Sequence, residues 1–122
     1  MEFSDYKNLN VWKLSIQLSK DIYLLVKKFP LEERFGLTDQ IKRSAVSVPS
    51  NIAEGQARNS NKDFIRFLLI SKGSLAELET QLIISKELGF IDSNELLCFT
   101  TTITSIGKMI SSLIKSLEKN KV

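Results

Sequence analysis

Residue types that carry enzyme chemistry are missing or scarce in this 122-residue sequence, which has no histidine, one cysteine and five glycines. Without histidine the chain lacks the commonest general base and the His ligands that di-iron helical bundles use. The glycines are scattered singly, so they cannot form a glycine-rich phosphate loop. We therefore predict a protein that is not an enzyme and that holds no metal and no cofactor.

The single cysteine and the apolar runs limit where the protein works. Cys98 alone can form neither an intrachain disulfide nor a zinc cluster, which fits a reducing compartment. Its apolar neighbours in the run LLCF predict a buried thiol. The sequence shows no apolar leader and no run near the roughly 18 residues of a membrane span. We expect a cytoplasmic protein without membrane contact.

The composition is that of one ordinary globular domain. Apolar residues make up 43% of the chain and charged residues 25%. The 17 lysines and arginines exceed the 14 acidic residues, which gives a net charge of +3. This mild basic excess permits contact with nucleic acid but does not demand it. We predict a single domain over residues 1–122.

Apolar residues recur every three or four positions in four stretches, which is the spacing of helices that bury one face. No stretch has the strict alternation of a strand. The stretches run from residue 10 to 29, from about 39 to about 57, from 61 to about 88 and from 93 to about 119. Because the connections are short, we predict an all-α fold, an antiparallel up-down four-helix bundle.

A polar residue precedes each expected helix and can cap its first amides. We predict one capping residue for each of the first two helices and a two-residue capping box for each of the last two. The expected caps are, in chain order, Asn10, Thr38, Ser60 with Asp63, and Asp92 with Glu95.

Three glycines predict features of the third and fourth helices, namely where one ends and how closely the two approach. Gly89 should end the third helix in the left-handed conformation. Gly73 and Gly107 fall at the same level of the antiparallel third and fourth helices, which predicts close approach of the two backbones there.

The stretch SVPSNIAEG places Pro49 inside the second helix. Proline lacks the amide hydrogen and collides with the preceding turn, so we predict that this helix is kinked at Pro49. The first and second helices also carry a second apolar row beside the one that faces the core, which predicts burial against another copy of the chain. The residues predicted at this oligomer interface are Trp12, Ile16, Tyr23, Arg43, Ser47, Pro49, Ser50, Glu54 and Arg58.

A basic surface is the second candidate site. Lysines recur every seven residues along the first helix, and basic residues exceed acidic ones between residues 40 and 74. These side chains could contact a phosphate backbone without reading bases, because no aromatic rings are interleaved with them. The alternative is an ordinary solvated helix face. The predicted nucleic-acid-binding residues are Lys13, Lys20, Lys27, Lys42, Arg43, Arg58, Lys62 and Arg66.

Three segments carry a family resemblance: NLNVWKLSIQLSKDIYLLVKKFP, FGLTDQIKRSAVSVPSNIAEGQARNSNKDFIRFL and KGSLAELETQLIISKELGFI. Together they resemble the four-helix bundle proteins encoded in intervening sequences of bacterial 23S rRNA, and SVPSNIAEG is the most specific part. That family is similar to the accessory variability determinant proteins of diversity-generating retroelements, which are basic and work with a reverse transcriptase and nucleic acid. The resemblance implies a cytoplasmic, non-catalytic homopentamer that associates with nucleic acid.

Two functions are open on these grounds. The first is a homo-oligomeric, pentameric bundle that binds structured RNA, RNA–protein complexes or DNA through backbone contacts. The alternative is a structural scaffold that binds a protein partner, such as a polymerase or reverse transcriptase, without touching nucleic acid. Salt-dependent binding to structured RNA separates the two.

Overall fold

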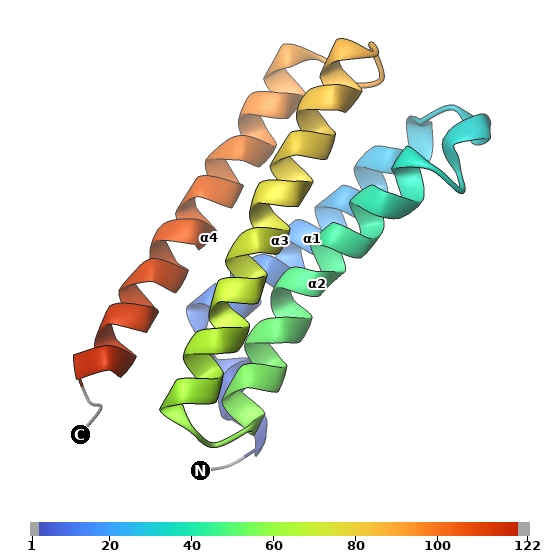
Figure 1. The fold of residues 1–122 in the computed structure, drawn as a ribbon. Helices are drawn as coiled ribbons and strands as arrows, with labels where there is room; N and C mark the ends of the chain where they lie inside the picture. The colour runs from blue at the N-terminus through green and yellow to red at the C-terminus, as the bar shows by residue number, and fades with distance from the viewer. Residues whose placement is uncertain (1–2, 120–122) are drawn as a thin grey trace.

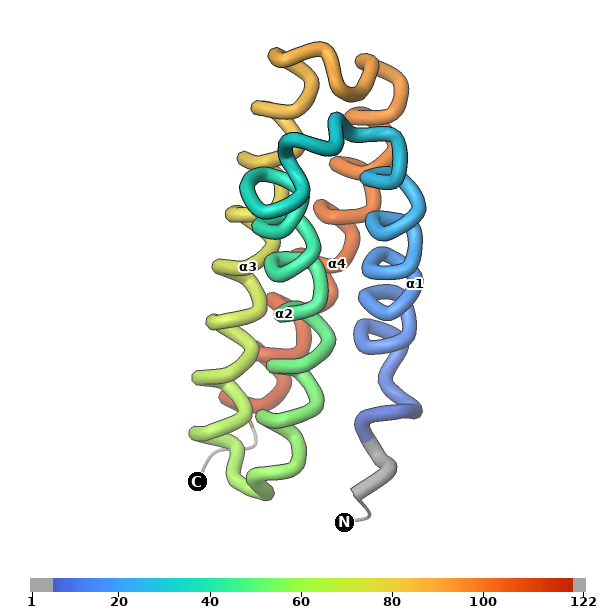
Figure 2. The backbone as a smooth tube through the Cα atoms, turned by 90° about the vertical axis from the view of Figure 1, so that its right-hand side faces the viewer, coloured from blue at the N-terminus to red at the C-terminus, as the bar shows by residue number. Residues whose placement is uncertain are grey.

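Four long helices form the part of the chain that the computed structural model describes, residues 3–119. They are α1 (Asn10–Leu25), α2 (Leu37–Ala57), α3 (Asn61–Glu87) and α4 (Ser93–Lys119), joined by the short 3-10 helices η1 (Phe3–Asn8), η2 (Val26–Lys28) and η3 (Leu31–Glu33). Consecutive helices run antiparallel (Figure 1), and α2 stands between α1 and α3, with α4 behind it (Figure 2). The predicted all-α four-helix bundle is confirmed. Residues 1–2 and 120–122 of the predicted domain lie outside the described part.

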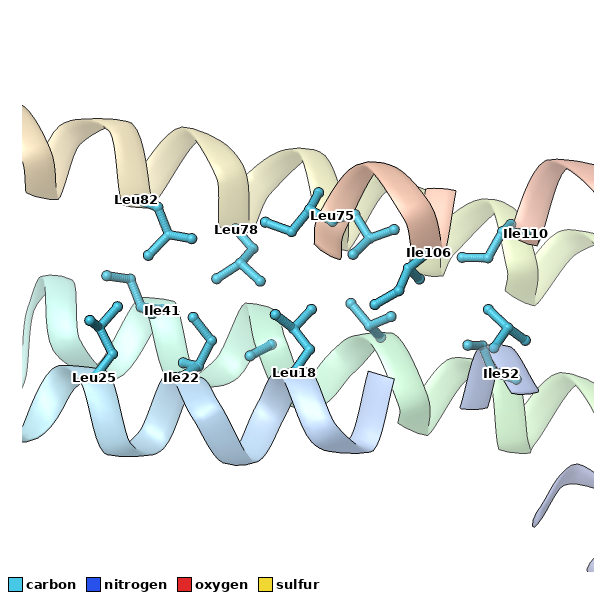
Figure 3. Packing of buried hydrophobic residues seen from close by; sticks show 14 of the residues in the cluster. Leu18, Ile22, Leu25, Ile41, Ile52, Leu75, Leu78, Leu82, Ile106 and Ile110 are labelled. Atoms are coloured by element: carbon cyan, nitrogen blue, oxygen red, sulfur yellow. The ribbon is translucent and has the colours of Figure 1, made fainter. Parts of the chain in front are cut away.

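The core consists of the predicted apolar row of each helix. Leu18 and Ile22 of α1 point into the space shared with Leu78 of α3 (Figure 3). On α4, the isoleucines at 103, 106 and 110 are buried, and the other inward residues are partly buried. The spacing of four and three residues along α3 selects one row of seven residues, and all of them are buried: Phe64, Leu68, Ser71, Leu75, Leu78, Leu82 and Ser85.

Helix α4 differs from one expectation of the sequence analysis. Its length and composition alone would let it cross a membrane, although we expected no such segment. One such helix is weak support for a membrane protein, because the test uses length and composition alone; only a small share of this apolar stretch is buried in the bundle. In this fold α4 packs its isoleucine row against the bundle.

The capping box predicted for α4 forms, and for α3 the Ser60 half of the predicted box forms. Ser60 Oγ accepts a hydrogen bond from the amide of Asp63 at 3.3 Å. Asp92 and Glu95 exchange bonds, each carboxylate accepting from the other's amide at 2.8 and 2.9 Å. Gly89 ends α3 with φ of 81°, as expected.

The caps predicted for α1 and α2 are wrong. Asn10 is the first residue of α1, and Leu9 is its N-cap without a side-chain bond. Helix α2 begins at Leu37, whose amide donates to Glu33 Oε1 at 3.4 Å, so Thr38 lies inside the first turn and is buried. The cap lies one residue before the predicted one in α1, at Leu9, and two residues before it in α2, at Gly36.

Glu95 makes stability depend on pH. A hydrogen bond from Lys28, together with the Asp92 amide, lowers the pKa of Glu95 below its ordinary value. A carboxyl with a lowered folded-state pKa stabilises the fold above its unfolded pKa, and this contribution disappears as the pH falls through the folded value. We expect Glu95→Ala to cost about 1 kcal/mol at neutral pH, the usual worth of a cap, and less in acid.

Urea denaturation at pH 7 and pH 3 measures this difference. The control is Glu77→Ala, an exposed glutamate of α3 that forms no ion pair with the side chains described. A loss of stability in Glu95→Ala that is the same at both pH values would contradict the assigned role.

The close approach of two backbones occurs at a different glycine from those predicted. A Cβ built on Gly73 or on Gly107 would meet no atom within 4 Å, so the expected crossing of α3 and α4 at these residues is wrong. A Cβ on Gly55 would lie 2.7 Å from Phe67 Cβ and 3.0 Å from Phe64 Cδ1. The tight crossing therefore lies between α2 and α3.

The prediction of a buried Cys98 is also wrong, because the thiol is exposed. The run LLCF covers more than one face of α4, whereas the helix buries only the stripe that contains Ile103 and Ile106. Its neighbour Leu97 is exposed for the same reason.

Candidate functional site

Pro49 is accommodated by a bond from a neighbouring helix. Helix α2 continues without a break through Pro49, and the kink predicted there stays a prediction. Proline leaves the carbonyl of Ala45 without its usual donor four residues on. The Ser19 hydroxyl of α1 lies 3.0 Å from that carbonyl and 3.0 Å from the carbonyl of Ser15, so the two acceptors share its hydrogen. The pairing of α1 with α2 thus supplies what the proline removes.

Serines connect α2 to α3 on its other side. Ser44 Oγ donates to Gln81 Oε1 at 2.8 Å inside the bundle. Ser71 Oγ donates to the carbonyl of Val48 at 2.9 Å. The hydroxyl of Ser47, which we predicted at an oligomer interface, lies 2.7 Å from that of Ser74. The Ser47 side chain is therefore engaged within the subunit.

An apolar groove of about 290 Å³ runs between α1 and α2, and we call it the α1–α2 groove. It gathers four of the residues predicted for the oligomer interface. Ile16 is 42% exposed and Val46 40% exposed, so large apolar side chains reach solvent here. Tyr23, 43% exposed, lines an adjoining hollow with Val46. The groove is lined by Tyr6, Trp12, Ile16, Ser19, Val46, Pro49, Ser50 and Ala53.

The charged residues predicted at that interface pair within α2. Arg43 Nε donates to Asp39 Oδ2 at 2.8 Å, and Arg58 donates to Glu54 Oε2 at 2.8 Å. The hydrogen bond with Glu54 raises the pKa of Arg58. All four side chains remain solvent-accessible, so these pairs add little stability to the single chain.

The predicted basic residues fall into a row and two clusters. Lys13, Lys20 and Lys27 follow one another along α1 and η2, about 10 Å apart along the axis. Lys42 lies near the start of α2 and Arg58 at its end, about 24 Å further along. The structure therefore does not gather all predicted residues into one patch.

The first cluster, which we call the connection cluster, consists of Lys27, Arg34 and Lys42 around the link between α1 and α2. Arg34 stacks over the ring of Phe35 at 4.7 Å, and Lys42 over Tyr23 at 4.9 Å. The expectation that no aromatic ring accompanies the basic residues is wrong. Sequence reasoning missed Arg34 and Phe35, although an adjacent cation and aromatic residue in a loop was the available signal.

The second cluster lies at the turn between α2 and α3, at the opposite end of the bundle (Figure 1). Arg58 and Arg66 both stack over the ring of Phe67, at 5.0 and 4.5 Å. Lys62 is exposed in the first turn of α3 beside them. Because Arg66 also lies 3.9 Å from Asp63, much of this charge is balanced locally.

Comparison with known proteins gives two positive findings. A family model described as "23S rRNA-intervening sequence protein" matches residues 7–112. A crystal structure of a protein with unknown function from the S23 ribosomal protein family of Bacteroides thetaiotaomicron is 29% identical, with a TM-score of 0.79. The similarity covers 86% of this chain and 98% of that one. No curated protein matches the chain.

Proposed function

Because the chain belongs to the 23S rRNA-intervening sequence protein family, we propose that it is a non-catalytic, self-assembling bundle that binds structured RNA through phosphate contacts. The observation that carries the proposal is the connection cluster at the end of the α1 lysine row. Its three cations form no ion pair with the side chains described, so they are free to meet phosphates. Catalysis is left out because the sequence has no histidine.

The proposal includes assembly into a cytoplasmic homo-oligomer, and five subunits is the number that the family resemblance implies. The exposed apolar side chains of the α1–α2 groove support assembly, because a monomer would leave them in water. The family resemblance also implies a likeness to accessory variability determinant proteins, and on that ground the proposal extends to a reverse transcriptase as partner. The α1–α2 groove also favours the alternative, in which a protein partner binds and nucleic acid does not.

RNA binding is tested with a variant that changes Lys13, Lys20, Lys27, Lys42 and Arg43 together to glutamine. We expect its affinity for a structured RNA to fall at least tenfold, measured by fluorescence anisotropy at low salt. The wild type should lose about 100-fold in affinity between 50 and 200 mM salt if about four phosphates are contacted.

A matched control removes the same charge elsewhere, by changing Lys72, Lys86, Lys108, Lys115 and Lys119 to glutamine. Its affinity should stay close to that of the wild type. Equal losses in both variants would mean that only net charge matters, and the proposed surface would be wrong. Salt-independent binding, or none, would favour the protein scaffold.

A further inference from the structure

A depression of about 190 Å³ lies where the link between α1 and α2 meets the first turns of α2. Its polar lining is the connection cluster with Thr38, and Phe29 and Pro30 belong to its apolar wall. This volume can hold one small chemical group, such as a phosphate, but not several nucleotides of an RNA strand. The row of lysines on α1, in contrast, is spread along the helix.

The charge around this depression is strongly one-sided. Three of its lining residues are cations, and no carboxylate is among the residues that line it. Of the four arginines, Arg34 is the one that forms no ion pair with a described side chain. Of the acids in this part of the chain, Glu33 accepts from the Leu37 amide, Asp39 pairs with Arg43, and Glu32 is exposed. None of the three lines the depression, whose own surface is therefore positively charged.

Uncommitted hydrogen-bond donors lie at the same place. Thr38 is only 9% exposed, and its buried hydroxyl has no hydrogen-bond partner among the described residues. A buried hydroxyl without a partner is costly unless a ligand satisfies it. Thr38 also lies in the first turn of the 21-residue helix α2, where amides lack acceptors within the helix and the dipole favours an anion.

We propose that this depression binds a phosphate monoester. A monoester carries nearly two negative charges and three acceptor oxygens, which suits three cations and the Thr38 hydroxyl better than a singly charged diester does. The planar guanidinium of Arg34 can hold two phosphate oxygens at once. The site takes a terminal phosphate, supplied either by the 5′ end of an RNA strand or by a small phosphorylated molecule.

Phe35 favours the strand as the source. It follows Arg34 directly and is 84% exposed, so its open face can stack with the first base. The site itself rests on the depression and its donors, and only the strand as source rests on the proposed RNA binding. Free phosphate and RNA therefore test separate parts of the inference.

The test is a set of amide-nitrogen NMR titrations of the labelled full-length chain. The probes are inorganic phosphate, a 5′-phosphorylated RNA oligonucleotide and the same oligonucleotide with a 5′-hydroxyl. We expect saturable shifts of the Thr38 and Asp39 amides with phosphate. The phosphorylated oligonucleotide should bind about tenfold more tightly than its hydroxyl counterpart.

Two variants localise the effect. Arg34→Gln should weaken phosphate binding about tenfold and abolish the preference for the 5′-phosphate. Lys115→Gln, an exposed position on α4 outside the predicted binding residues, should leave both unchanged. Phe35→Ala should weaken the phosphorylated oligonucleotide but not inorganic phosphate.

The outcomes separate the site from the proposed function. Saturable phosphate shifts without any RNA binding would support the site, identify a small molecule as its ligand and refute the proposed function. RNA binding without phosphate shifts at Thr38 and Asp39, and without a 5′ preference, would overturn the site alone. Phosphate shifts that persist unchanged in Arg34→Gln would also overturn it.

Discussion

Replacing Gly55 with alanine should destabilise the protein by about 2 kcal/mol. In an ordinary helix interior the same replacement stabilises a protein by up to about 1 kcal/mol. The reason is the crossing of α2 and α3. A Cβ on Gly55 would stand 2.7 Å from the Cβ of Phe67, an atom fixed to the backbone. The two helices would have to separate, and the packing of Phe64 would be disturbed with them.

Gly73→Ala is the matched control, because a Cβ there would meet nothing within 4 Å. It should stabilise the chain by about 0.5–1 kcal/mol. Urea denaturation of both variants at one protein concentration measures the contrast, since association would otherwise shift the apparent stability. If Gly55→Ala were as stable as Gly73→Ala, α2 and α3 would lie further apart at Gly55 than the structure shows.

Changing Ile16 to glutamate should turn the assembled protein into a monomer. Ile16 is 42% exposed in the single chain, so a glutamate at this position leaves the core intact. In an assembly that buries the α1–α2 groove, the carboxylate would lie among apolar side chains, at a cost of several kcal/mol for each interface. Light scattering coupled to size exclusion should give the wild type a mass of five times 13.8 kDa and the variant a mass near 13.8 kDa.

Leu97→Glu is the control for this experiment. Leu97 is 65% exposed on α4 and does not line the α1–α2 groove, so its variant should keep the wild-type mass. Circular dichroism should show the same helix content in all three proteins. A wild-type mass near 13.8 kDa at micromolar concentration would refute assembly, and an Ile16→Glu variant with the wild-type mass would place the interface elsewhere.

The spacing of apolar residues predicted the fold because every helix of a bundle must bury one apolar face. Each residue of the row from Phe64 to Ser85 had to face the core, and two serines within that row are buried with the rest. The caps of α3 and α4 were predictable for a similar reason, since a capping box is a local pattern of two residues. The caps of α1 and α2 were not, because the preceding 3-10 segments decide where those helices begin.

Contacts between helices could not be predicted from spacing alone. Gly73 and Gly107 lay at matching levels, but the glycine at a tight helix crossing is Gly55. How closely two helices approach depends on their tilt, which spacing in the sequence does not give. Arg34 was overlooked since it lies outside the periodic segments, and only the folded link brings it beside Lys42. The partner of the carbonyl freed by Pro49 was also hidden, because Ser19 lies 26 residues away.

Serine hydrogen bonds fix the positions of α1 and α3 along the axis of α2. Apolar rows repeat at nearly every turn, so α1 could slide by one turn, about 5.4 Å, and still bury leucine and isoleucine against α2. Such a slide would carry the Ser19 hydroxyl away from the Ala45 carbonyl, and a slide of α3 would separate Ser71 from Val48. Each slipped arrangement would leave a buried polar group without a partner. Pro49 leaves the Ala45 carbonyl open to the Ser19 hydroxyl, and this bond therefore marks the register in which the bundle closes.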